Sequence, residues 1–184
     1  VLYQALEKQN RIVTQAELAR ALNISLSIVN SAIKNLERIG AVRVNPRNFH
    51  IQDPKKILYY WASIRNIPKD IMYQTRVESP ILEIEKSVSN TTIFGMYTAY
   101  KIHYKDVPAD YSEVYIYDYE EIKKRFLPKK GPSNVIVLKK DILMERYGKI
   151  TTLAQTFVDL WNCKQWYAKE FLNAFEEKLN GILE

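Results

Sequence analysis

The organisation of the chain is decided by residues 14–40, TQAELARALNISLSIVNSAIKNLERIG. Thr14 stands before a run of helix-forming residues and Glu17 follows three positions later, which is the spacing of a capping box at a helix start. Apolar residues recur at helical spacing on both sides of a short polar turn. The pattern therefore predicts two helices, residues 15–22 and 26–39, joined by a tight connection.

The second of these helices has one apolar side and one polar side. Its predicted inward stripe comprises Val29, Ile33 and Leu36, with Ala32 beside them, and Gly40 fits the C-cap that ends the helix. Short polar and basic residues remain for the other faces: Ser27, Asn30, Ser31, Lys34, Asn35 and Arg38. Small side chains of this kind let a helix approach the DNA major groove, where asparagine pairs with adenine.

The segments around these two helices complete a small module. A helix is expected over residues 2–9, and residues 41–51 predict a short hairpin that carries two arginines. Pro54 then opens a further helix that continues to about Ile64. We interpret the hairpin as a wing that lies beside the second helix of the pair.

This order of turn, helix and hairpin resembles the winged helix-turn-helix regulators, including the MarR-like group, over residues 1–65. The residues that carry the resemblance are Asn23-Ile24-Ser25, Val29, Ala32-Ile33-Lys34, Leu36-Glu37 and Gly40-Ala41-Val42. The resemblance implies double-stranded DNA as the partner. The predicted contact residues are Ser25, Ser27, Asn30, Ser31, Lys34, Asn35 and Arg38 on the helix, and Arg43, Arg47 and Asn48 on the wing.

Charge separates the two parts of the chain. Residues 1–79 hold twelve Lys and Arg against six Asp and Glu, whereas residues 80–184 hold fifteen of each. The whole net charge of +6 therefore accompanies the helix pair. Neutralised phosphates supply the sequence-independent part of DNA binding, so this asymmetry favours DNA over the alternative, a winged helix used for protein contacts.

Composition excludes several classes of protein. Cys163 is the only cysteine, so neither an internal disulfide nor a thiol-based zinc site is expected, and a reducing cytoplasm is the natural compartment. No apolar run approaches the roughly 20 residues that span a bilayer, and the chain does not open like a signal peptide. Because Val1 is not a methionine, we expect residues before it. His50 and His103 are far apart in sequence, without a metal-ligand partner nearby.

Beyond residue 67 the pattern changes to short strands that alternate with helices. Helices are expected from Ser79-Pro80, over 96–104, over 119–126, from Thr152 and from Trp166; strands are expected at 91–95, 113–117 and 134–138. The chain is therefore predicted to be α+β, with a winged helix-turn-helix domain over 1–66. A small α/β domain over 67–184 follows and ends in long helices.

Two stretches of this second part resemble known families. Residues 94–100, FGMYTAY, with residues 109–115, ADYSEVY, resemble the start of the nucleotidyltransferase fold, in which a glycine pair opens a helix and a strand then bears paired aspartates. Residues 151–160, TTLAQTFVDL, resemble a segment of AbiEi-type antitoxins, which also place a winged helix before a transferase-like domain. This resemblance implies an antitoxin-like autorepressor with a cognate toxin as partner.

The chain departs from the transferase pattern at the residues that would bind Mg²⁺. Such enzymes need converging carboxylates, whereas this strand carries Glu113, Tyr115 and Tyr117, and Met96 replaces the second glycine. We therefore predict no catalytic or metal-binding residues and no cofactor. The alternative is an active nucleotidyltransferase that uses Asp118 and Glu120 with a further acid such as Asp141. A homodimer is also expected, because helix-turn-helix proteins often match twofold operators.

Overall fold

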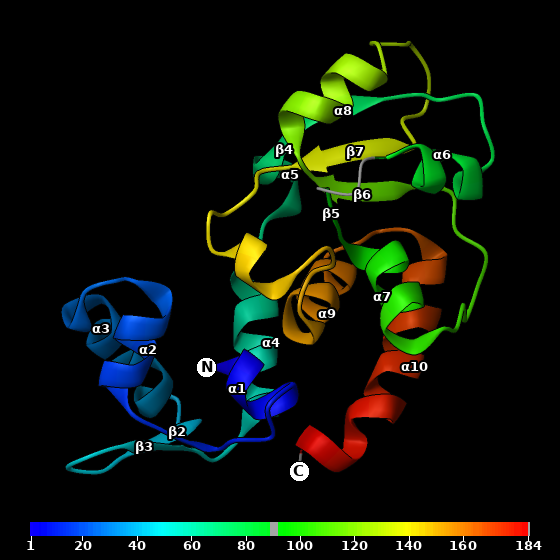
Figure 1. Ribbon diagram of the computed structural model, residues 1–184. Helices are drawn as coiled ribbons and strands as arrows, with labels where there is room; N and C mark the ends of the chain where they lie inside the picture. Colours follow the sequence, from blue (N-terminus) through cyan, green and yellow to red (C-terminus); the bar gives the residue numbers. More distant parts are fainter. Residues whose placement is uncertain (89–91, 184) are drawn as a thin grey trace. The chain divides into compact units, whose positions relative to one another are not determined.

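A computed structural model describes residues 1–88 and 92–183 of the chain. It divides into two compact units. Unit 1 comprises Val1–Ser63 and Glu177–Glu184, and unit 2 comprises Ile64–Glu176. The predicted α+β class is confirmed: a winged helix-turn-helix precedes an α/β part that ends in long helices (Figure 1).

Unit 1 is built as the sequence predicted, with one additional strand. Its elements are α1 (Leu2–Leu6), β1 (Ile12–Val13), α2 (Gln15–Leu22), α3 (Leu26–Arg38), β2 (Val42–Val44), β3 (Phe49–Ile51) and α4 (Pro54–Ile64). The strands form an antiparallel sheet in the order β1-β3-β2. Phe49 and Ile51 of the central strand are fully buried, so β3 holds the wing against the core.

The helices of unit 1 bury most of the apolar residues that their spacing predicted. Leu2, Ala5 and Leu6 are buried on α1, although this helix is shorter than the expected 2–9. Val29, Ile33 and Leu36 are buried on α3. Ala32, which the sequence placed beside this stripe, is instead exposed.

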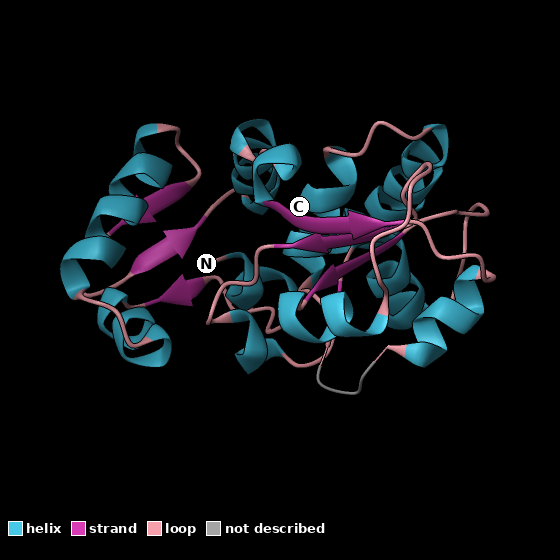
Figure 2. Ribbon diagram, turned by 90° about the horizontal axis from the view of Figure 1, so that it is seen from above, coloured by secondary structure: helices cyan, strands magenta, loops and turns pink. Residues whose placement is uncertain are grey.

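Unit 2 is centred on a mixed sheet of four strands. Its elements are α5 (Ile67–Asp70), β4 (Ile71–Thr75), α6 (Ile81–Ser87), β5 (Ile93–Phe94), α7 (Met96–Tyr104), β6 (Val114–Tyr117), α8 (Tyr119–Arg125), β7 (Val135–Leu138), the 3₁₀ helix η1 (Met144–Tyr147), α9 (Leu153–Trp161) and α10 (Trp166–Leu183), whose last residues belong to unit 1. The strand order is β4-β7-β6-β5, with β6 and β7 parallel and the other two pairs antiparallel (Figure 2). Strand β4 was not predicted. Thr91, the first residue of the predicted strand 91–95, lies outside the described residues.

Helices cover both faces of this sheet, as Figure 1 shows. On one face, α6 and α8 pack on the two central strands. The buried cluster there comprises Ile84, Val88, Val114, Ile116, Ile122, Val135 and Val137. Since β6 and β7 are buried on both faces, each is a nearly continuous apolar run, which is why the sequence revealed them.

The other face of the sheet meets α7, α9 and the first turns of α10 through aromatic side chains. Tyr97 lies 5.0 Å from Phe171 and 6.1 Å from Tyr115 between ring centroids, and Phe157 lies 5.7 Å from Phe175. Two tryptophans of α9 and α10, Trp161 and Trp166, do not take part in this packing to the same extent. They are 45% and 73% exposed.

A buried carboxylate links three parts of unit 2. Asp159 of α9 has no exposed surface. It accepts hydrogen bonds from Arg65 Nε at 2.9 Å, from Gln155 Nε2 at 2.9 and 3.0 Å to its two oxygens, and from the hydroxyl of Tyr117 on β6. Arg65 also pairs with Asp70. The Arg65 guanidinium therefore belongs to an internal network.

The two partners of the buried ion pair respond differently to burial, which raises the pKa of Asp159. Burial lowers the pKa of Arg65, but its contacts with Asp159, Tyr117 and Asp70 more than offset this, and the pKa ends above its usual value. The guanidinium therefore stays protonated and remains a donor to Asp159. No helix in the described part of the chain is long and apolar enough to cross a membrane.

Replacement of Arg65 by alanine should destabilise unit 2 strongly. Removal of one partner from a buried ion pair leaves the other charge unpaired, which typically costs about 3–5 kcal/mol. Urea unfolding of the wild type and of Arg65→Ala, followed by circular dichroism, measures this loss. Arg65→Lys should lose less, because an ammonium keeps the charge without the planar fork. A change below about 1 kcal/mol in Arg65→Ala would show that the network contributes little.

His103 makes the stability of unit 2 depend on pH. Its Nε2 lies 2.7 Å from the carbonyl oxygen of Thr151 and donates to it, and burial lowers the pKa of the ring below its usual value. Between the lowered pKa and about 6.5, the unfolded chain binds more protons than the folded one. The stabilisation is therefore complete above that range and is lost as pH falls through it.

The difference in urea midpoint between pH 7 and pH 5 should shrink in His103→Gln, whose amide can still donate to the Thr151 carbonyl but does not titrate. An undiminished difference in this variant would assign the pH dependence to other groups.

Candidate nucleic-acid interface

The position of α2 is fixed by hydrogen bonds at both of its ends. At its start the predicted capping box is present: the Glu17 N–H donates to Thr14 Oγ1 at 3.1 Å, and the Thr14 N–H donates to Glu17 Oε2 at 3.0 Å. These bonds hold the pKa of Glu17 below its usual value. At its end Asn23 takes a left-handed conformation with φ of 54°, a conformation that asparagine tolerates well. The chain therefore turns sharply into α3.

The outward side of α3 forms a polar and basic stripe. Buried Val29, Ile33 and Leu36 define its inner face. The residues at i, i+4, i+7 and i+11 project from the opposite face and are all exposed: Ser27, Ser31, Lys34 and Arg38. Asn35 is exposed next to them. Within the described chain, no hydrogen bond or ion pair engages these five side chains, so they are available to a ligand.

Two other predicted contact residues of α3 already have partners. The hydroxyl of Ser25 caps the helix by accepting from the Ile28 N–H at 3.3 Å. The Asn30 amide donates to Gln15 Oε1 of α2 at 3.2 Å, and the side chain is half-buried. Of the two asparagines predicted to contact bases, Asn35 is therefore the one whose amide is unbonded.

Apolar side chains that the sequence analysis did not select flank the start of the stripe. Leu26 is 54% exposed and Ile28 is 58% exposed. Both lie outside the buried stripe of α3. Their spacing from Val29, Ile33 and Leu36 in the sequence would have predicted that they are exposed. Apolar groups of this kind are suited to the methyl group of thymine in the major groove.

The hairpin 41–51 has the geometry of a wing. At its tip the Asn45 N–H donates to the Asn48 carbonyl at 2.8 Å, and the Asn45 amide donates to Asn48 Oδ1 at 3.0 Å. Arg43 lies opposite His50 in the register of β2 and β3. Both Arg43 and Arg47 are exposed, whereas Asn48 is half-buried and bonded within the tip.

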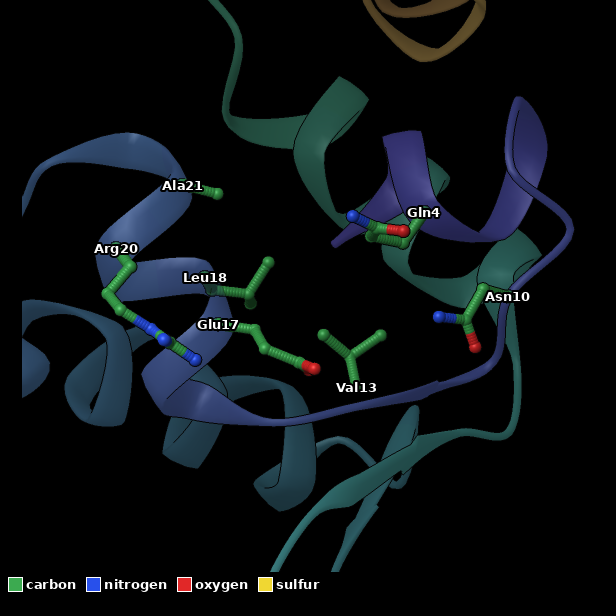
Figure 3. Close-up of a pocket in the computed structure, with 7 residues that line it drawn as sticks. All are labelled: Gln4, Asn10, Val13, Glu17, Leu18, Arg20 and Ala21. Carbon is green, nitrogen blue, oxygen red and sulfur yellow. The ribbon is translucent and has the colours of Figure 1, made fainter.

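Unit 1 also contains a hollow of about 530 Å³ between α1, β1 and α2 (Figure 3). Val13 and Leu18 form its apolar floor, with Gln4 and Asn10 on one side and Arg20 on the other. Glu17 also lines it, but its carboxylate is already bound in the capping box. The hollow brings none of the predicted contact residues together.

The acids considered for a metal site in unit 2 do not converge. Asp118 is the N-cap residue of α8, and Thr92 donates to its carboxylate at 3.5 Å. In the part of the chain that the structure describes, Asp118, Glu120 and Asp141 form no group that could hold a metal ion, and neither do other sets of three or more His, Cys, Asp or Glu. Tyr115 and Tyr117 are buried in the strand where paired acids would stand.

Cys163 also differs from a reactive thiol. Burial raises the pKa of this thiol to about 12, although Lys164 follows it in the chain. Its sulfur lies 3.3 Å from Met96 Sδ. Because the thiolate is the nucleophilic form, the thiol is unreactive at neutral pH.

Comparison with known proteins identifies the type of unit 1. Residues 2–43 match a family model described as winged helix-turn-helix DNA-binding. No curated protein and no solved structure gives a significant match. The matched segment runs from α1 into β2, so the chain carries a winged helix-turn-helix domain of the DNA-binding type at its N-terminus.

Proposed function

We propose that the chain is a transcription regulator that binds a specific sequence of double-stranded DNA through α3 and the wing. The observation that carries this proposal is the outward stripe of α3, whose serines are small and whose Lys34 and Arg38 are exposed and unbonded. Small residues allow the helix into the groove, and the basic ones neutralise phosphates or contact guanine. The wing adds two exposed arginines, Arg43 and Arg47.

A winged helix can instead serve protein contacts, and salt distinguishes the two uses. Phosphate binding releases counterions, so the affinity for DNA falls steeply as salt rises. Purified protein should therefore be titrated with the duplex upstream of its own gene and with a scrambled duplex of equal length, across a range of salt. Tight and salt-dependent binding to the upstream duplex alone supports an autorepressor. Equal weak binding to both would contradict sequence-specific regulation.

For unit 2 we propose a nucleotidyltransferase-like scaffold without catalysis, which senses a signal or assembles with a partner. Two backbone features at the start of α7 support the scaffold. A Cβ on Gly95 would lie 3.0 Å from the ring of Tyr117, so a larger residue would require this buried ring to shift. Met96 has φ of 48°, a conformation that a bulky residue rarely adopts and glycine adopts freely. Both features are ones that a glycine pair at this helix start would also allow, and they support the proposed scaffold.

An antitoxin-like role follows from the same resemblance and requires a toxin encoded beside this gene. We also propose that the regulator binds DNA as a homodimer, which matches twofold operators. Inspection of the neighbouring genes tests the first proposal, and light scattering with and without DNA tests the second. If no toxin gene lies beside this gene, the proposed antitoxin role is ruled out, whereas the proposed DNA binding is unaffected.

Removal of single basic groups should weaken binding on every sequence. Lys34→Ala and Arg47→Ala should each lower affinity and reduce the slope of log affinity against log salt by about one, if each side chain neutralises one phosphate. Fluorescence anisotropy at several salt concentrations measures both quantities. Lys124→Ala, which removes an exposed lysine of α8 in unit 2, is the matched control. Unchanged affinity in both unit 1 variants would refute this docking.

Asn35 should contribute to sequence preference. Asn35→Ala is expected to cost about 1–3 kcal/mol at one base pair, because a bidentate contact to adenine is lost. Binding to a set of duplexes with single base substitutions locates that position. Asn30→Ala is the informative comparison, since its amide is held by Gln15. If Asn30→Ala alters base preference and Asn35→Ala does not, the assignment of the reading residue is reversed.

A further inference from the structure

Unit 2 contains a hollow of about 480 Å³ on the face of its sheet opposite α6 and α8. Gln74 of β4 pairs with Ile136 of β7, and Ile136 pairs with Tyr115 of β6. Residues paired across neighbouring strands point to the same face, so these three side chains form a continuous floor. The hollow has the size of a small-molecule site.

The floor is largely apolar. Ile136 and Tyr115 are 5% and 7% exposed, and Ile71 and Ile67 line the same hollow from β4 and α5. Since all of these residues belong to strands or a helix of one compact unit, the floor is preformed. A ligand that covers it would bury apolar surface of its own, which favours a hydrocarbon or aromatic portion.

Two opposite charges stand at the rim of this hollow without pairing with each other. Glu113 precedes β6, and Lys164 lies in the connection between α9 and α10. Neither forms an ion pair with a described residue. The Lys164 side chain is exposed, whereas Glu113 is half-buried. A half-buried carboxylate without a cationic partner is costly unless something compensates its charge.

Neutral donors orient the Glu113 carboxylate. It accepts hydrogen bonds from the hydroxyl of Tyr167 and from Gln165 Nε2, the latter at 3.4 Å. Burial, followed by the bond to Glu113, raises the pKa of Tyr167 to about 12, so its hydroxyl stays protonated and donates. The remaining lone pairs of the carboxylate are free to accept from a ligand.

We propose that this hollow binds a small zwitterion of the amino-acid type, with its ammonium on Glu113, its carboxylate on Lys164 and an apolar side chain on the floor. An ammonium supplies the missing counter-charge for the half-buried acid. A carboxylate on the same molecule uses the lysine, which would repel a simple cation. Such a ligand makes unit 2 the sensor of the regulator. Binding itself does not depend on the proposed function, because its measurement contains no DNA.

Isothermal titration of the full chain with L-leucine and L-phenylalanine is the direct test. Two analogues divide the contacts: N-acetyl-L-leucine lacks the ammonium, and L-leucinamide lacks the carboxylate. Both should bind at least about tenfold more weakly than leucine, the usual consequence of losing a charge-assisted hydrogen bond. If neither L-leucine nor L-phenylalanine binds at millimolar concentration, the proposal is overturned.

Two variants assign the charges to their residues. Glu113→Gln should weaken the binding of leucine about ten- to a hundredfold. It should also abolish the difference in affinity between leucine and N-acetyl-L-leucine. Lys164→Gln should abolish the difference between leucine and leucinamide, and this exposed substitution does not threaten the fold. Glu120→Gln, at an exposed residue of α8 on the other side of the sheet, should bind leucine like the wild type. Retention of both differences in the first two variants would place the ligand elsewhere.

Cys163 provides a second readout, because it lines the hollow and is the only cysteine. A bound zwitterion should slow its alkylation during a long incubation with excess reagent near pH 8, where leucine keeps its ammonium and the small thiolate fraction reacts slowly. Protection by leucine but not by N-acetyl-L-leucine supports the proposed site even if Glu113→Gln fails to fold. Equal alkylation with and without saturating leucine would contradict occupancy of the hollow.

Discussion

The structure of unit 2 depends on how it accommodates one fully buried charge. A carboxylate in the protein interior costs several kcal/mol unless its charge and lone pairs are compensated. Asp159 is compensated by Arg65, Tyr117 and Gln155, which come from the segment after α4, from β6 and from α9. These partners must meet at one point, so the network fixes α9 against the sheet. Tyr115, two residues before Tyr117 on the same strand, thereby acquires its place in the floor of the hollow.

In unit 1 the polar side chains on the outward face of α3 have no partners within the described chain. In unit 2 the polar side chains around Asp159 satisfy one another, whereas the outward residues of α3 are held by a well-packed inner face and left without internal partners. Side chains such as Lys34 and Asn35 lose little by being solvated, and they keep their hydrogen-bonding groups for a ligand. The capping box and the left-handed Asn23 then determine where this face points within the unit. Local hydrogen bonds thus position the outward face of α3, and the side chains on that face form no hydrogen bonds or ion pairs within the described chain.

How far the sequence predicted this structure depended on the range of the interactions involved. The helix pair, the wing and the two central strands of unit 2 are specified by nearby residues, and all were predicted. Strand β1 has two residues and β4 is only partly buried, so both depend on distant pairing that no local pattern reveals. The role of Arg65 depends on a residue 94 positions away. The one local sign was the acid at position 159 within an apolar run. The hydrogen bond between Asn30 and Gln15 could not be predicted either. A helical pattern predicts which residues are exposed, but it does not predict their hydrogen-bond partners.

The last helix bears on how the molecule is made. Helix α10 begins in unit 2, yet its residues from Glu177 onward belong to the compact unit that contains the DNA-binding motif, and Leu179 there is fully buried. Chains are synthesised from the amino terminus, and early domains commonly fold while the rest is still being made. In this chain the last residues that belong to the first unit are made only after the whole of unit 2 has been translated. A product truncated before Glu177 would therefore lack these residues of unit 1 while it keeps residues 2–43, which match the DNA-binding family model.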